Sequence, residues 1–304
     1  MRVSIQSIID YLGDEIITVY GRVEHAFVDN LADSEHVTEY TLDWVNSSKK
    51  NKQEIAENSK AQCLFVDKSV HNSEVIIQKK KVLLVVRKPR MALAQVANHF
   101  FVEKIKAGIH PTAIIDSFAQ ISPLAHISAG CVVGKAKIGA GTVLMPNVVV
   151  YDNVAIGDNC IIQAGAVIGT DGLGCSRDET GYLTKFPHMG GVVIGDEVEI
   201  GANSQIAKGS FSDTIIERGC KLNGLCFVAH NCHLEENVWI TGNSMLCGSV
   251  HIAKNTTIFS SVIIRDQRTI GEGVIIGMGS VVTKNVPDGE TWVGNPARKF
   301  EKDQ

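Results

Sequence analysis

The feature that most constrains the fold is an aliphatic residue at every sixth position over long stretches of the chain. Shorter runs with this spacing begin at Ile109, Ile138 and Ile194. A period of six matches neither the 3.6-residue period of an α-helix nor the two-residue period of a lone strand. It predicts a coil of short strands in which each hexapeptide forms one flat face, and three faces, or 18 residues, close one turn. The longest run has no exception: Ile216, Leu222, Val228, Leu234, Ile240, Leu246, Ile252, Ile258, Ile264, Ile270, Ile276 and Val282.

The same repeat accounts for the unusual composition. Aromatic residues make up only 6% of the 304 residues, and there are 28 glycines. A narrow prism of stacked coils has room mainly for Ile, Val, Leu and small residues. Glycine often follows the aliphatic residue, as at Gly139 and Gly201, where we expect a turn with a positive φ. Five of the eight cysteines lie four residues after an aliphatic residue and are predicted to be small buried residues: Cys131, Cys160, Cys220, Cys226 and Cys232.

Charge and hydropathy exclude several classes of protein. A net charge of −4 provides no basic field for nucleic acid. No apolar run approaches the ~18 residues of a membrane span, and Asp10, Asp14 and Glu15 do not fit a signal peptide. We therefore expect a cytoplasmic protein, in which disulfides are rare. The sequence contains no Cys-x-x-Cys pair that would support a zinc site.

The repeat divides the chain into two expected domains. Residues 1–108 lack it and alternate helical patterns with strand-like stretches such as KVLLVV, which predicts a small α/β domain. Residues 109–304 are expected to form a mainly β domain built from the hexapeptide coils. A polar stretch at 169–191 interrupts the repeat and predicts a loop that leaves the coil. Its first residues, GTDGLG, precede no helix, so a phosphate-binding loop is not expected.

An 18-residue coil places residues 18 apart on the same corner of successive coils, about 4.8 Å apart. His230, Gly248 and Asp266 are related in this way. A histidine can take the proton from an attacking amine or hydroxyl, and a glycine amide can donate to a developing oxyanion. The line suits acyl transfer, although three polar residues could also share an exposed turn without a function. His233 and His251, also 18 apart, are predicted to form a stacked surface pair, and no metal site is expected.

The chain resembles known proteins in its repeat and in four longer sequence blocks. The hexapeptide period resembles the left-handed parallel β-helix of hexapeptide-repeat proteins. Four blocks in order resemble the UDP-3-O-acylglucosamine N-acyltransferases of lipid A synthesis, over nearly the whole chain: IQAGAVIGTDGLG, KFPHMGGVVIGDEVEIGA, KGSFSDT and FVAHN. This resemblance implies a homotrimer with active sites between neighbouring β-helices. It also implies transfer of an acyl group from a thioester to the amine of a nucleotide-activated sugar.

The resemblance also implies roles for individual residues. His230 falls in the family's Ala-His-Asn motif as the catalytic base, and Gly248 falls on the oxyanion glycine. Trp44 and Asn46 are the nearest counterparts of the residues that hold the nucleotide base, where an indole could stack. An ordinary core position is the alternative for Trp44. Asn231 or Asp266 is expected to orient the base or to hold donor or sugar.

The chain departs from this family in ways that concern the substrate. Asp266 stands where the family has a second histidine. The family's Asp-Arg-Gly-Ala block reads Ala-Lys-Gly-Ser here, with Lys208 in the place of the arginine. The ending VVTKNVPDGETWVGNPARKF resembles coenzyme A-dependent hexapeptide acetyltransferases that act on amino-sugar nucleotides. In those enzymes basic residues near the last coils meet the coenzyme phosphates. Lys284 and Arg298 are therefore candidates for coenzyme binding, or else solvated charges.

These observations together favour one function and leave two alternatives. We expect an N-acyltransferase that moves a short acyl group, such as acetyl, from acyl-CoA to the amine of a UDP- or dTDP-linked amino sugar. Such an enzyme would serve surface-polysaccharide synthesis, in lipopolysaccharide or O-antigen. One alternative is the lipid A UDP-3-O-acylglucosamine N-acyltransferase itself, with a 3-hydroxyacyl group on acyl carrier protein. The other is a non-catalytic β-helix that binds a nucleotide sugar or serves as a scaffold.

Overall fold

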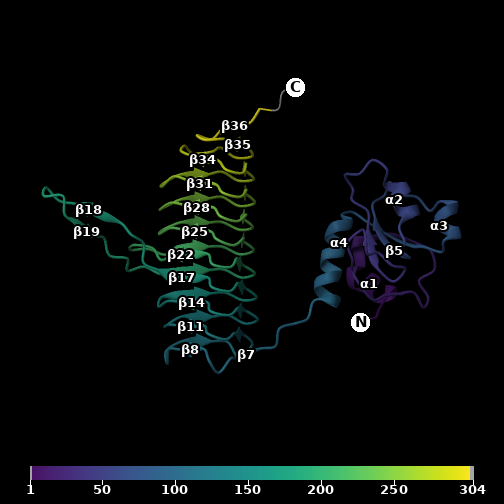
Figure 1. Cartoon of the computed structure of the whole chain (residues 1–304), viewed down its shortest axis with the longest axis horizontal. Coiled ribbons are helices and arrows are strands. Elements are labelled where there is room, and N and C mark those ends of the chain that lie inside the picture. Colours follow the sequence, from purple (N-terminus) through teal and green to yellow (C-terminus); the bar gives the residue numbers. More distant parts are fainter. Residues whose placement is uncertain (1, 302–304) are drawn as a thin grey trace. The chain divides into compact units, whose positions relative to one another are not determined.

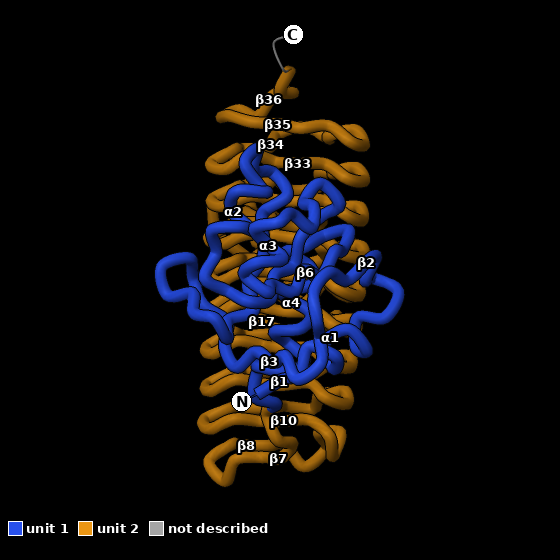
Figure 2. Tube along the Cα trace, turned by 90° about the vertical axis from the view of Figure 1, so that its right-hand side faces the viewer, with its two compact units in different colours: residues 1–104 blue, residues 105–304 orange. Residues whose placement is uncertain are grey.

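The computed structural model describes residues 2–301. The chain forms two compact units, residues 1–104 and 105–304, drawn in blue and orange in Figure 2. The first strand of the coils, β7 (Gly108–Ile109), begins within the last residues of the expected first domain. Within residues 2–301, no helix combines the length and the apolar character that crossing a bilayer requires.

The second unit is a parallel β-helix whose coils are stacked as Figure 1 shows. Three sheets form its faces, and paired strands of one sheet belong to successive coils, except at the carboxyl end, where β36 pairs antiparallel with β35. The first sheet contains β7, β10 (His126–Ile127), β13 (Val143–Leu144), β16 (Ile161–Ile162), β21 (Glu199–Ile200), β24 (Lys221–Leu222), β27 (Trp239–Ile240), β30 (Thr257–Ile258), β33 (Ile275–Ile276), β35 (Thr291–Val293) and β36 (Arg298–Lys299).

The other two faces have the same construction. The second sheet contains β8 (Ile114–Ile115), β11 (Val132–Val133), β14 (Val149–Val150), β17 (Val167–Thr170), β22 (Gln205–Ala207), β25 (Phe227–Val228), β28 (Met245–Leu246), β31 (Ile263–Ile264) and β34 (Val281–Val282). The third contains β9 (Gln120–Ile121), β12 (Lys137–Ile138), β15 (Val154–Ile156), β20 (Val192–Ile194), β23 (Thr214–Ile216), β26 (His233–Leu234), β29 (His251–Ile252) and β32 (Thr269–Ile270).

The aliphatic residues of the repeat point into this prism and stack on one another. All twelve members of the longest run are at most 2% exposed. Strand pairing places Leu222 opposite Ile240, and Ile240 opposite Ile258, so like residues meet in successive coils. The predicted β-helix and its core are thus confirmed. The five cysteines of the repeat are also buried, as predicted, and burial raises the pKa of Cys232 to about 12.

The glycines that follow an inward aliphatic residue serve a different purpose from the expected one. Gly139 and Gly201 do not have a positive φ, so that prediction is wrong for them. A Cβ on Gly139 would lie 2.4 Å from the carbonyl oxygen of Gly157, and one on Gly201 would lie 2.2 Å from the carbonyl carbon of Asn223. The backbone of the next coil therefore occupies the space of a side chain. Positive φ values occur three positions after the aliphatic residue, often at asparagine, which tolerates them; Asn231 has a φ of 60°.

The predicted loop at 169–191 leaves the coil between β17 and β20, and part of it is regular. Strands β18 (Cys175–Arg177) and β19 (Leu183–Lys185) pair antiparallel as a hairpin that projects from the stack in Figure 1. A second irregular segment, residues 208–213, connects β22 to β23. Both insertions precede the coil that carries His230.

The first unit is a small α/β domain, as expected. Its sheet has the order β2 (Ile16–Tyr20), β6 (Val82–Val86), β5 (Cys63–Val66), β4 (Leu42–Trp44), and β1 (Val3–Ser4) pairs with β3 (Phe27–Val28). β5 and β6 are buried throughout, as in parallel sheets covered on both faces. The helical segments are α1 (Ile5–Leu12), η1 (Gly13–Glu15), α2 (Lys52–Asn58), α3 (Glu74–Gln78), α4 (Pro89–Val96) and the π-helical turn η2 (Ala97–Phe101).

A matched pair of substitutions in β33 tests the inward stacking. Ile276 is fully buried, whereas the neighbouring Ile275 is 41% exposed on the outer face. We expect Ile276→Ala to lower the free energy of unfolding by about 2–5 kcal/mol because it leaves a cavity between coils. Ile275→Ala should cost less than about 1 kcal/mol. Urea titration followed by circular dichroism would measure both, and equal losses would contradict the assigned inward face.

Candidate active site

His230, Gly248 and Asp266 lie on one corner of three successive coils, as their spacing predicts. Val228 of β25 is opposite Leu246 of β28, which is opposite Ile264 of β31. Each site residue comes two positions after one of these aligned residues, so the three site residues are aligned as well. The corners are joined by backbone hydrogen bonds of 2.9 Å from the Ser249 amide to the His230 carbonyl and from the Gln267 amide to the Gly248 carbonyl. The sheet register therefore sets the spacing of the line.

Asn231 determines which nitrogen of His230 carries the proton. Its Oδ1 accepts from the Ser210 amide at 3.1 Å, and its Nδ2 donates to the Ser212 carbonyl at 3.2 Å and hydroxyl at 2.9 Å. An amide N–H only donates and a carbonyl only accepts, so these neighbours fix the orientation of the Asn231 side chain. His230 Nδ1 lies 3.0 Å from Oδ1 and must be the donor. In the neutral ring the lone pair is then on Nε2.

Gly248 lies against the free edge of the His230 ring. A Cβ at Gly248 would lie 2.6 Å from His230 Cε1 and 2.7 Å from Nε2. Any larger residue would displace the imidazole, so the glycine is required by the close approach. Within residues 2–301 the Gly248 amide has no hydrogen-bond acceptor. The His230 nitrogen that carries the lone pair therefore lies close to Gly248, whose backbone N–H has no acceptor in the described part of the chain.

Asp266 and Lys284 continue the line toward the carboxyl end. The Asp266 side chain is half exposed, and its Oδ1 lies 3.4 Å from the Arg265 Nε. Ile264 of β31 is opposite Val282 of β34, so Lys284 occupies the next equivalent corner. Sequence reasoning proposed Lys284 only from resemblance and missed that it belongs to the same 18-residue series. The side chain of Arg298, in β36, is exposed, and its Nη1 donates to the Ala297 carbonyl at 2.8 Å.

A second histidine at the site comes from the loop at 169–191 and was missed from the sequence. The His188 and His230 rings meet edge to face with centroids 5.2 Å apart. His188 is 6% exposed, and its Nδ1 lies 3.1 Å from the Phe186 carbonyl. Burial, and then the nearby His230, lower the pKa of His188, so its ring is neutral at neutral pH. The only available signal was the insertion itself, since loops of a solenoid often gather on its working face.

Exposed apolar side chains surround this part of the loop. Phe186 and Phe211 pack edge to face with centroids 5.3 Å apart, and both are exposed, as is Met189. Phe211 lies between the two serines, Ser210 and Ser212, that hold Asn231. Apolar surface therefore adjoins the polar corner.

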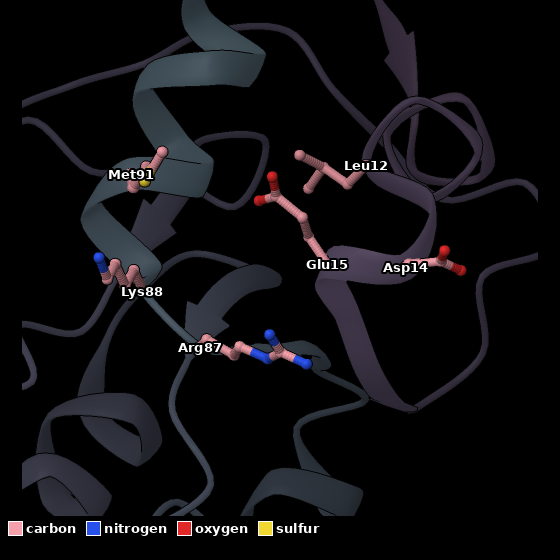
Figure 3. A pocket seen from close by; sticks show the side chains of 6 residues that line it. All are labelled: Leu12, Asp14, Glu15, Arg87, Lys88 and Met91. Atoms are coloured by element: carbon pink, nitrogen blue, oxygen red, sulfur yellow. The ribbon is translucent and has the colours of Figure 1, made fainter.

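The expected nucleotide residues lie in the first unit. Trp44 ends β4 and is half-buried against the core of that unit. Asn46 Oδ1 accepts from the Ser48 amide at 3.0 Å and hydroxyl at 2.9 Å, which closes a local turn. A pocket of about 410 Å³ in the same unit, shown in Figure 3, includes neither residue. Its walls carry charges of both signs, and it is lined by Leu12, Asp14, Glu15, Arg87, Lys88 and Met91.

His233 and His251 form the stacked pair that the sequence predicts. Their ring centroids are 5.1 Å apart at an interplanar angle of 23°. Each binds a carboxylate through Nε2, His233 to Glu217 at 2.7 Å and His251 to Glu235 at 2.9 Å. Nowhere in the described part of the chain do three or more His, Cys, Asp or Glu side chains gather as a metal ion would need.

Comparison with known proteins adds to this geometry. The family model "Bacterial transferase hexapeptide (six repeats)" matches residues 135–170. The UDP-3-O-acylglucosamine N-acyltransferase of Coxiella burnetii (strain RSA 493 / Nine Mile phase I) is 37% identical over 177 residues, which is 52% of each chain. The enzyme of that name from Pseudomonas syringae pv. tomato is 38% identical over 175 residues, 51% of this chain and 49% of the relative.

Solved structures show the same fold. The UDP-N-acetylglucosamine acyltransferase of Francisella novicida gives a TM-score of 0.58 at 25% identity, with 64% of this chain and 70% of that chain covered. The corresponding protein of Campylobacter jejuni gives 0.56 at 26% identity, with 64% and 74% covered. Both matches are consistent with the β-helix described above.

The sequence resemblance is confirmed, but it covers less of the chain than expected. The chain spans about half the length of the curated relatives it matches, and the aligned part is 52% of this chain rather than nearly all of it. Over that half, this chain is a hexapeptide-repeat protein similar to the UDP-3-O-acylglucosamine N-acyltransferases.

Proposed function

We propose that this protein transfers an acyl group from a thioester to the amine of a nucleotide-linked amino sugar, with His230 as general base. The observation that carries the proposal is the corner itself. Asn231 leaves the lone pair of His230 on Nε2, and that nitrogen lies close to Gly248, whose amide has no acceptor among residues 2–301. A base and an oxyanion donor are the two groups that acyl transfer requires.

The proposed reaction is direct transfer. The neutral amine attacks the thioester carbonyl carbon, and His230 Nε2 takes a proton from nitrogen as the C–N bond forms. The carbonyl oxygen becomes an oxyanion that accepts a hydrogen bond from the Gly248 amide. The C–S bond then breaks, and the imidazolium returns its proton to the sulfur, so that a thiol leaves and the base is regenerated. Asn231 stabilises the imidazolium through its Oδ1.

For the substrates, the relatives favour the lipid A type of reaction over the acetyl-CoA reaction expected from the sequence. Their names specify UDP-3-O-acylglucosamine, and the structural neighbours are named for UDP-N-acetylglucosamine. We therefore propose a UDP-linked glucosamine derivative as acceptor and a 3-hydroxyacyl group on acyl carrier protein as donor. The exposed Phe186 and Phe211 support this choice, because a long acyl chain needs apolar surface and an acetyl group does not.

The remaining roles belong to the same proposal. Trp44 and Asn46 would hold the nucleotide base, and Asp266, two coils from His230 on the same corner, would bind donor or sugar. Lys284 and Arg298 would meet phosphates of the donor. We propose that the protein acts in the cytoplasm as a homotrimer.

A panel of substrate pairs tests the choice of donor and acceptor. UDP-3-O-acylglucosamine and a dTDP-linked amino sugar would each be offered with 3-hydroxyacyl carrier protein and with acetyl-CoA. We expect the highest kcat/KM for UDP-3-O-acylglucosamine with the carrier-protein donor. Turnover only with acetyl-CoA would overturn the proposed donor, and no transfer with any pair would favour a binding protein without catalysis.

Removing the base tests the catalytic assignment. We expect His230→Ala to lower kcat by about 100- to 10,000-fold, the usual loss of a general base, with the melting temperature nearly unchanged. His233→Ala is the control, because His233 belongs to the same coil but pairs with Glu217 at the surface. A folded His230→Ala protein with near-normal turnover would defeat the assignment.

A further inference from the structure

The loop at 169–191 returns to the coils at His188, which contacts His230 and has no role in the reaction proposed above. We propose that His188 is a positioning residue that holds the His230 imidazole, and that Gly172 is the loop residue that allows it to do so. The inference rests on the proposed function, because it concerns the base of that reaction. It adds a role for the inserted loop, to which the proposed reaction assigns no step.

The His188 ring is fixed and uncharged. The Phe186 carbonyl can only accept, so the Nδ1 that lies 3.1 Å away is the donor, and Nε2 is unprotonated. That Nε2 is buried without a hydrogen-bond partner in the described part of the chain. Burial, and then the nearby His230, lower the pKa of His188. The hydrogen bond to the Phe186 carbonyl and then Asp171 raise it by less, and Lys185 lowers it slightly further. An uncharged aromatic ring therefore packs against the base.

His188 supplies a constraint that the other neighbours of His230 do not. Asn231 holds one nitrogen at 3.0 Å, and Gly248 closes the edge toward the next coil. A single hydrogen bond still permits a small swing of the ring, because its angle can vary. The edge-to-face contact with His188, at 5.2 Å between centroids, opposes that swing. The ring is then held with Nε2 beside the Gly248 amide.

Gly172 leaves the space that His188 occupies. A Cβ at Gly172 would lie 2.4 Å from His188 Nε2 and 3.0 Å from Cδ2. The backbone of Gly172 does not have a positive φ, so an alanine there would meet the His188 ring without backbone strain. Gly174 offers a matched comparison in the same loop. A Cβ at Gly174 would lie 3.5 Å from the Cβ of Phe186 and 4.0 Å from His188 Cε1, both ordinary contacts, and its φ is not positive either.

The base of the loop is fastened to the segment that holds Asn231. Asp171 binds Lys185 at 2.6 Å and Lys208 at 2.9 Å. Hydrogen bonds from Lys185 and then from Lys208 lower the pKa of Asp171 to about 2, so its carboxylate is charged at neutral pH. Lys208 is the first residue of the segment 208–213, whose Ser210 amide donates to Asn231. The two insertions are therefore joined to each other, and both restrain His230. Residues 208–213 act through Asn231, and the loop at 169–191 acts through His188.

The matched glycine variants test this inference without altering either histidine. We expect Gly172→Ala to lower kcat by about 10- to 100-fold, because a displaced base reacts poorly, with KM for both substrates nearly unchanged. Gly174→Ala should match wild type, and both should melt at the wild-type temperature. His188→Ala should reproduce the loss, and adding Gly172→Ala to it should cause no further loss. His188→Phe should restore most of the activity because it restores the ring.

Three results would overturn the inference: equal kcat for Gly172→Ala and Gly174→Ala, wild-type kcat for His188→Ala, or no rescue by His188→Phe. Crystal structures of the two glycine variants separate this inference from the proposed function. We expect the His230 ring to be displaced in Gly172→Ala alone. That displacement would support positioning even if wild-type protein transferred no acyl group, whereas an unmoved ring would contradict it.

Discussion

The hydrogen bonding of each coil to the next is the constraint on which the rest of the structure depends. It repeats the backbone every 18 residues, so that aliphatic residues stack inside and corner residues stack outside. The coils approach so closely that glycine is needed at Gly139 and Gly201 to make room for the neighbouring backbone. The same close approach brings Gly248 against His230. The site thus depends on the same close spacing between coils that is found elsewhere in the domain.

The coils are regular, and the two insertions add irregular segments to the corner that carries His230. Residues 208–213 hold Asn231, which determines the tautomer of His230. The loop at 169–191 brings His188 and the exposed Phe186 to the same corner. Regular coils therefore set the spacing between His230 and Gly248, the proposed base and oxyanion donor, and irregular segments orient His230 and add apolar surface.

The parts that follow from periodicity could be predicted from the sequence, and the parts that follow from irregular segments could not. Stepping by six identifies the buried residues, and stepping by 18 identifies the line from His230 to Asp266. The path of an insertion is not periodic, so nothing in the sequence indicated that His188 would reach His230. The role of Gly139 was misjudged because a close backbone approach and a positive φ both favour glycine. The acetyl-CoA donor was inferred from a short terminal motif, whereas the longer alignment favours the lipid A reaction.

The most direct test of the central claim is a double-mutant cycle between Gly248 and His230. According to this claim, the register of the coils creates the site because it places Gly248, which has no side chain, against the ring of His230, the proposed base. Gly248→Ala keeps the amide but adds the Cβ that would lie 2.6 Å from the His230 ring. We predict that kcat/KM falls by about 100-fold, and that the same substitution has no further effect in a His230→Ala background. Wild-type kcat/KM for Gly248→Ala, or an equal loss in both backgrounds, would contradict the account.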